Sequence, residues 1–88
     1  LALADSLTDR PLIATNLNRL GETYFRQEEF KESQRCYLQL LHLAQRTSDL
    51  SETQKAYLGL SKVAVAENDY KKAYDYYREY SNAKEAFA

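Results

Sequence analysis

The chain resembles itself at a spacing of 40 residues, and this feature constrains its fold more than any other. The matching positions are Leu3-Ala4 and Leu43-Ala44, Asp9 and Asp49, Leu20 and Leu60, Phe30 and Tyr70, Lys31 and Lys71, and Tyr37 and Tyr77. Self-similarity at a fixed period is the signature of repeat arrays, in which each unit buries its apolar face against its neighbours. The 88 residues are therefore expected to form a short array.

Apolar residues between these matching positions recur at helical spacing, three or four residues apart. They are Ile13, Leu17, Leu20 and Tyr24 in one segment, and Tyr37, Leu40, Leu41 and Ala44 in the next. The alternation typical of strands is absent, and two Gly and one Pro leave few places where a helix would break. The pattern predicts an all-α fold.

Capping and turn residues set the expected helix boundaries. Pro11 suits the first turn of a helix, with Thr8 or Asp9 as its cap, and Asp49 with Glu52 resembles a capping box.

Two polar segments, 27–29 and 67–69, interrupt the apolar rhythm at equivalent points. In the second, Asn68 tolerates a left-handed backbone and Asp69 can cap the helix that follows. We expect helices at 11–27, 30–47, 51–66 and 70–86, with residues 1–7 as the last turns of an earlier helix.

Small and aromatic residues recur in a fixed order within each unit. These positions hold Leu17, Leu20, Gly21, Tyr24, Phe30, Ser33 and Tyr37 in the first unit, and Tyr57, Leu60, Ser61, Ala64, Tyr70, Ala73 and Tyr77 in the second. This order resembles the tetratricopeptide repeat. The resemblance covers nearly the whole chain and implies antiparallel helix hairpins stacked as an α-α superhelix. Residues 1–88 would form one domain, with 1–8 as the tail of a preceding helix, 11–47 as the first repeat and 51–87 as the second.

Small residues at matching places are expected to let the helices of each pair touch. Gly21 would face Ser33, and Ser61 would face Ala73. The predicted helix-packing residues are Leu17, Leu20, Gly21, Tyr24, Ser33, Tyr37, Tyr57, Leu60, Ser61, Ala73 and Tyr77. Some positions depart from the family pattern: Ala64 replaces an aromatic residue, Leu40 and Tyr80 replace small ones, and the period exceeds the usual length of about 34 residues.

The sequence offers no catalytic, metal or cofactor site. Cys36 and His42 lie six positions apart and so do not share a helix face, and a second Cys or His that could complete a metal site is absent. Gly21 and Gly59 lie within predicted helices rather than in a phosphate-binding loop. Twelve Lys and Arg against 13 Asp and Glu give a net charge of −1, which argues against nucleic acid or an anionic membrane as a partner.

The resemblance implies a binding face, because in such arrays the first helix of each pair lines a concave groove that contacts an extended or helical peptide. Transferred by position, this face holds Asn18, Glu22, Phe25, Arg26, Lys55, Leu58, Lys62 and Val65. Family members that clamp a terminal carboxylate use a Lys and an Asn where this chain has Asn18 and Glu22, so such a clamp is not expected. The alternative is a solvated helix face without a partner.

The last predicted helix carries two tyrosine stripes. Tyr70, Tyr74 and Tyr77 form one, and Tyr76 and Tyr80 form the other. One stripe is expected in the core; the other, joined by Phe87, is expected to dock a following helix or a second copy. Self-association through this helix or through the segment 1–7 is therefore predicted.

An alternative function follows from a looser resemblance. Residues 69–87 resemble the closing repeat of arrays in bacterial sensor kinases and transcription regulators, which would make the chain a signal-input or dimerisation segment. No stretch approaches the roughly 20 apolar residues of a membrane span, and residues 1–7 are too short and too acidic for a signal peptide. A single Cys fits a reducing compartment. The compartment stays open: the cytoplasm is favoured, with an extracytoplasmic sensor domain as the alternative. Since the chain begins with Leu and has no Met, it is expected to be part of a longer protein.

Overall fold

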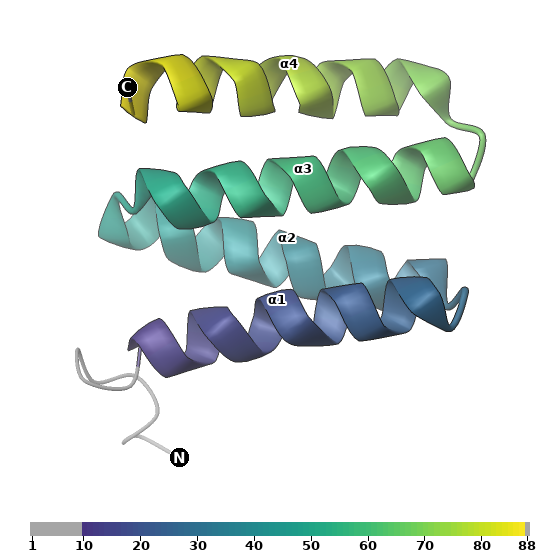
Figure 1. Cartoon of the computed structure of the whole chain (residues 1–88), viewed down its shortest axis with the longest axis horizontal. Coiled ribbons are helices and arrows are strands. Elements are labelled where there is room, and N and C mark those ends of the chain that lie inside the picture. Colours follow the sequence, from purple (N-terminus) through teal and green to yellow (C-terminus); the bar gives the residue numbers. More distant parts are fainter. Residues whose placement is uncertain (1–9, 88) are drawn as a thin grey trace.

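The computed structural model describes residues 10–87, and this part of the chain forms four α-helices without any strand (Figure 1). They are α1 (Arg10–Arg26), α2 (Phe30–Thr47), α3 (Leu50–Ala66) and α4 (Tyr70–Phe87). Each predicted helix begins and ends within one residue of these bounds. The all-α prediction is confirmed, whereas the helix predicted at residues 1–7 lies outside the described residues.

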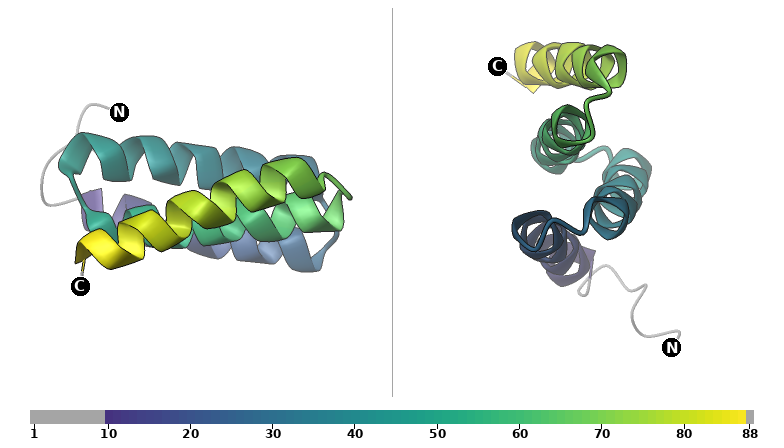
Figure 2. Two further views of the ribbon diagram at one scale, coloured as in Figure 1. Left: turned by 90° about the horizontal axis from the view of Figure 1, so that it is seen from above. Right: turned by 90° about the vertical axis from the view of Figure 1, so that its right-hand side faces the viewer.

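The helices run antiparallel to their neighbours in the chain and pack against them (Figure 1). α1 also contacts α3, whereas α2 and α4 make no contact with each other between residues 10 and 87. Seen nearly end-on, the helices follow a zigzag in which α2 is displaced from α1 and α3 (Figure 2). This arrangement places α1 and α3, the first helices of the two predicted repeats, side by side.

The three connections share one backbone device. Each contains a residue with positive φ, namely Glu28, Ser48 and Asn68, at 61°, 55° and 63°. The amide of the next residue then donates to a carbonyl in the last turn of the helix that has just ended: Glu29 to Tyr24, Asp49 to Ala44 and Asp69 to Ala64, each at 2.9 Å. A single left-handed residue thus closes the helix and reverses the chain. The prediction that Asn68 adopts this conformation is confirmed.

Two aspartates cap the helices that follow. Asp49 Oδ1 accepts a hydrogen bond from the Glu52 amide at 3.1 Å, and Asp69 Oδ1 accepts one from the Lys72 amide at 3.2 Å. The prediction of a complete capping box is wrong, because its second hydrogen bond would run from the Asp49 amide to the Glu52 carboxylate. The Asp49 amide is already bonded to the end of α2, and the Glu52 carboxylate pairs instead with Lys55 Nζ at 3.2 Å.

The core is centred on Tyr37, Leu40, Leu60 and Val63, each at most 5% exposed. The two helices of the first hairpin touch where the sequence predicted: Ser33 Oγ donates to the Gly21 carbonyl at 2.7 Å in a buried contact. Further along the chain, Ser61 and Ala73 are also buried. Close backbone approach through small residues therefore holds the first hairpin together.

Two predicted packing residues are exposed: Leu20 at 46% and Tyr77 at 54%. No element among residues 10–87 covers their faces of α1 and α4. The residue that matches Gly21 in the second unit is Ser61 rather than a second glycine. The ring of Tyr77 lies 5.4 Å from that of Tyr80.

Of the two tyrosine stripes, the one with Tyr76 lies on the core side of α4, whereas the sequence predicts packing for Tyr77 of the other stripe. Tyr76 packs against the core and its ring lies 6.5 Å from that of Tyr57, whereas Tyr70 and Tyr74 are exposed together with Tyr77. The reason is that Ala73 and Ala83 face inward, and Tyr76 lies on the same side of the helix as these small residues. Predicted self-association remains a prediction, now centred on the exposed stripe.

Candidate binding groove

A groove of about 510 Å³ lies between α1 and α3. It is lined by Asn18, Glu22, Phe25 and Arg26 of α1, Tyr37 of α2, and Lys55, Leu58, Gly59 and Lys62 of α3. The fold thus brings together the residues predicted for the concave face from two separate helices. Val65 is the exception: it does not line the groove, and its side chain is 50% exposed.

Tyr37 forms the inner wall of this groove because two glycines make room for its ring. A Cβ atom added at Gly21 would lie 2.7 Å from Tyr37 Cζ, and one added at Gly59 would lie 2.4 Å from Tyr37 Cε1. Contacts this short are not tolerated, so any side chain at either position would displace the ring. Tyr37 is accordingly 5% exposed and in contact with both α1 and α3.

Burial is the main reason that the pKa of the Tyr37 phenol is raised to about 12; the negative charge of Glu22 contributes in the same direction, and Arg26 acts in the opposite sense. The phenol therefore stays protonated at neutral pH. A protonated phenol beside the groove can donate a hydrogen bond to a bound group as well as accept one.

The apolar part of the groove is held in place by packing. Phe25 packs against the core, and its ring makes an edge-on contact with Phe30 at 5.5 Å between centroids. Leu58 is half-buried on the opposite wall. These two side chains offer an apolar surface from both helices to one ligand side chain.

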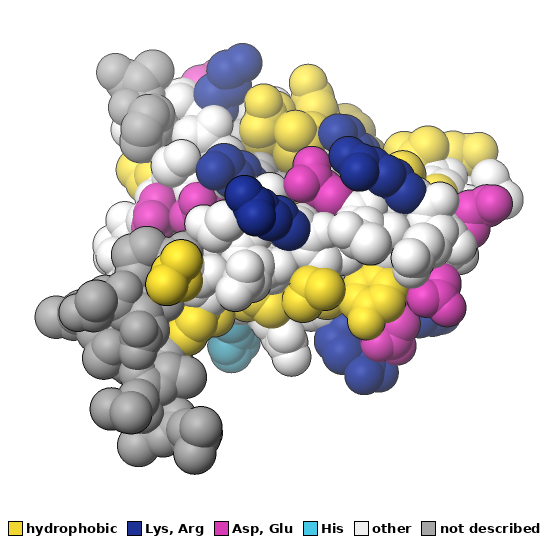
Figure 3. Space-filling model, turned by 60° about the horizontal axis from the view of Figure 1, so that its bottom comes forward, with side chains coloured by type: hydrophobic (Ala, Val, Ile, Leu, Met, Phe, Trp, Pro, Cys, Tyr) yellow, Lys and Arg dark blue, Asp and Glu magenta, His cyan; other side chains and the backbone are white. Residues whose placement is uncertain are grey.

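The charged part of the groove is mainly basic. Arg26, Lys55 and Lys62 line it together with a single carboxylate, Glu22. Figure 3 shows basic side chains across the middle of the molecule, with acidic side chains between them. Lys55 is held by its ion pair with Glu52, whose remaining carboxylate oxygen is buried without a partner. The groove therefore presents positive charge beside an apolar surface.

The described residues hold no cluster of Cys, His, Asp and Glu that could bind a metal. Cys36 is buried, and burial raises the pKa of its thiol, so it is not an activated nucleophile. His42 is exposed and lies outside this groove. Among residues 10–87, no helix has the length and hydropathy to cross a membrane.

Sequence reasoning missed part of this groove. The sequence predicts a packing role alone for Tyr37, and it marks Gly59 only as a glycine within a helix. The repeat gave no signal for Gly59, because the residue 40 positions earlier is Arg19. The available signal was the pair of glycines on helices that both approach one aromatic ring, and this becomes visible only when α1 and α3 are placed side by side.

Antiparallel helices that repeat along the chain, with their first helices sharing a groove, define an α-helical repeat protein. Comparison with protein families matches residues 12–86 to the tetratricopeptide repeat. The chain belongs to the tetratricopeptide repeat family, which confirms the resemblance seen in its sequence. Repeats of this family are typically non-catalytic modules for protein–protein interaction. No curated protein and no solved structure matched the chain.

Proposed function

We propose that this chain is a protein-interaction module whose α1–α3 groove holds an extended or helical segment of a partner protein. The observation that carries the proposal is the convergence of apolar and basic side chains from two helices onto one groove with a fixed aromatic wall. Because the groove is built on packed helices rather than loops, the chain loses little conformational entropy on binding. Affinity is expected in the micromolar range, at about −8 kcal/mol.

The lining specifies the chemistry of the partner segment. Phe25 and Leu58 would contact an apolar side chain, while Arg26 and Lys62 would pair with carboxylates placed on either side of it. Exposed ion pairs of this kind each contribute about 0.2–1 kcal/mol, so the apolar contact is expected to dominate affinity and the charges to select the partner. An apolar residue flanked by Asp or Glu is the expected motif.

Selection of peptides from a random display library against the whole chain tests this proposal. Selected peptides should share the expected motif and should bind the Phe25→Ala, Lys62→Glu double variant at least about tenfold more weakly, a loss of about 1.4 kcal/mol. Lys72→Glu on α4 is the matched charge reversal outside the groove and should leave binding unchanged.

Circular dichroism and thermal unfolding establish that each variant is folded, which matters because Phe25 contributes to the core. The single variant Lys62→Glu, at an exposed position, provides a second measurement that is independent of packing. Equal peptide binding by the wild type and both groove variants would remove the α1–α3 groove as the binding site.

A further inference from the structure

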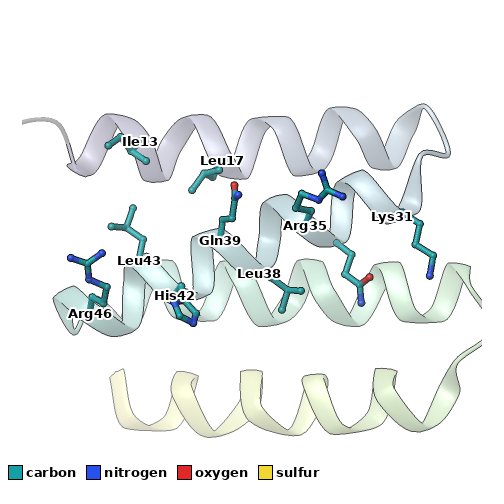
Figure 4. A pocket seen from close by; sticks show the side chains of 10 residues that line it. Ile13, Leu17, Lys31, Arg35, Leu38, Gln39, His42, Leu43 and Arg46 are labelled. Carbon is teal, nitrogen blue, oxygen red and sulfur yellow. The ribbon is translucent and has the colours of Figure 1, made fainter. Parts of the chain in front are cut away.

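A second, larger groove of about 730 Å³ runs along α2 and shares no lining residue with the α1–α3 groove. Figure 4 shows its side chains: Ile13 and Leu17 come from α1, and the remaining residues come from α2, with Lys31 at one end and Arg46 at the other. This groove belongs to no residue set predicted for partner binding.

The middle of the second groove is apolar. Ile13, Leu17, Leu38 and Leu43 line it, and Leu38 is 41% exposed. Figure 3 shows hydrophobic side chains in a band along the lower part of the molecule, from beside the histidine to a group of basic and acidic side chains. An exposed apolar strip bounded by polar residues is typical of an interaction site.

The charged residues that line this groove are all basic: Lys31, Arg35 and Arg46, with no carboxylate among the lining residues. Lys31 and Arg35 do have acidic neighbours, but at 3.6 Å to Glu67 and 3.8 Å to Glu32, and the basic side chains of these pairs are largely exposed. Such pairs contribute little and exchange readily for a better placed carboxylate. The charge of the groove therefore complements an acidic ligand.

The spacing of the lining residues along α2 sets the length of the ligand. A single stripe follows the helix at intervals of three or four residues and holds Lys31, Arg35, Leu38, His42 and Arg46. From Lys31 to Arg46 this stripe spans about 22 Å at a rise of about 1.5 Å per residue. A helix of about 15 residues laid along α2 would match this length.

We propose that the second groove binds an acidic amphipathic helix of a partner protein. Leucine or isoleucine on one face of that helix would contact Leu17 and Leu38, and glutamates at its two ends would pair with Lys31 and Arg46. Binding in this mode joins an apolar stripe to a groove, and the charges at both ends fix the register of the helix along it. The proposal concerns a site separate from the α1–α3 groove and does not depend on it.

The test uses a fluorescein-labelled synthetic helix of about 15 residues, with Leu along one face and Glu on both flanks, titrated with the whole chain in fluorescence anisotropy. A control peptide replaces every Glu by Lys. The acidic peptide should bind, the basic one should bind at least about tenfold more weakly, and affinity should fall as salt rises from about 0.05 M to about 0.5 M because the charges are exposed.

Matched variants locate the site. Leu38→Glu and Arg46→Glu change exposed residues of the second groove and should each weaken binding by about tenfold or more, whereas Lys62→Glu in the α1–α3 groove should have no effect. Circular dichroism confirms that the variants are folded.

Three results would overturn the proposal. The first is equal binding of the two peptides, and the second is a loss of binding with Lys62→Glu but not with Leu38→Glu. The third is failure of the acidic peptide to bind the whole chain at any salt concentration in this range. A negative result in this assay leaves the function proposed for the α1–α3 groove intact, since the two are tested by different variants.

Discussion

Replacing Gly59 by alanine is expected to destabilise the fold, although alanine is the better helix former. The added Cβ would lie 2.4 Å from Cε1, 2.5 Å from Cζ and 2.6 Å from Cδ1 of Tyr37. The ring is 5% exposed and touches both α1 and α3, so it cannot move aside without losing a contact. The clash must therefore be relieved by shifting packed groups.

Two opposing terms set the size of this effect. Overpacking of a core costs about 1–3 kcal/mol, and the higher helix propensity of alanine offsets about 1 kcal/mol of it. The net loss of unfolding free energy is thus about 1 kcal/mol. In a Tyr37→Ala background the clash is absent, and Gly59→Ala should instead stabilise the fold by about 1 kcal/mol. The change in unfolding free energy caused by Gly59→Ala is therefore expected to have opposite signs in the two backgrounds.

A double-mutant cycle measures this reversal. Urea unfolding of the wild type, the two single variants and the double variant, all in the same concentration of trimethylamine N-oxide to keep the weakest one folded, should give a coupling of about 1–3 kcal/mol. If Gly59→Ala changes the unfolding free energy equally in both backgrounds, Tyr37 is not packed between the two glycines and the account of the groove wall is wrong.

Four further outcomes are expected. Ser33→Ala should lower the unfolding free energy by about 1 kcal/mol in urea, because the buried hydrogen bond to the Gly21 carbonyl is lost. The pKa of the Tyr37 phenol is raised from 10.0 to about 12 by folding, so this phenol ionises at lower pH in the unfolded chain. The unfolding free energy should therefore fall as pH rises from 10.0 to about 12, and pH-dependent denaturation of Tyr37→Phe should show a shallower fall. Glu28→Gly should raise the melting temperature and increase the unfolding free energy by up to about 1 kcal/mol. The reason is that Glu28 has a φ of 61°, a conformation that is unfavourable for a residue with a Cβ. Sedimentation at about 100 μM should detect self-association that weakens in Tyr77→Ser, because Tyr77 is 54% exposed; a monomer under these conditions would contradict it.

The helices, their ends and the close contact of the first hairpin were predictable from the sequence, because the interactions that determine them are local or recur at a fixed spacing. Apolar residues three and four positions apart mark a helix face whatever surrounds it. Asn68 and Asp69 act on neighbouring backbone groups, and Gly21 with Ser33 occupies a place that the family pattern marks. The residues of the α1–α3 groove could be proposed for the same reason, by transfer from that pattern.

Exposure at the two faces of the array was decided only by tertiary structure. Tyr37 and Tyr77 occupy the same position in the repeat, yet one is 5% exposed and the other 54%, because Tyr37 has glycines on two helices beside it and Tyr77 does not. Likewise, the spacing of the α4 tyrosines does not by itself distinguish the inner stripe from the outer one. Burial depends on which helix lies opposite, and the identity and spacing of a residue do not show which distant residues will pack against it.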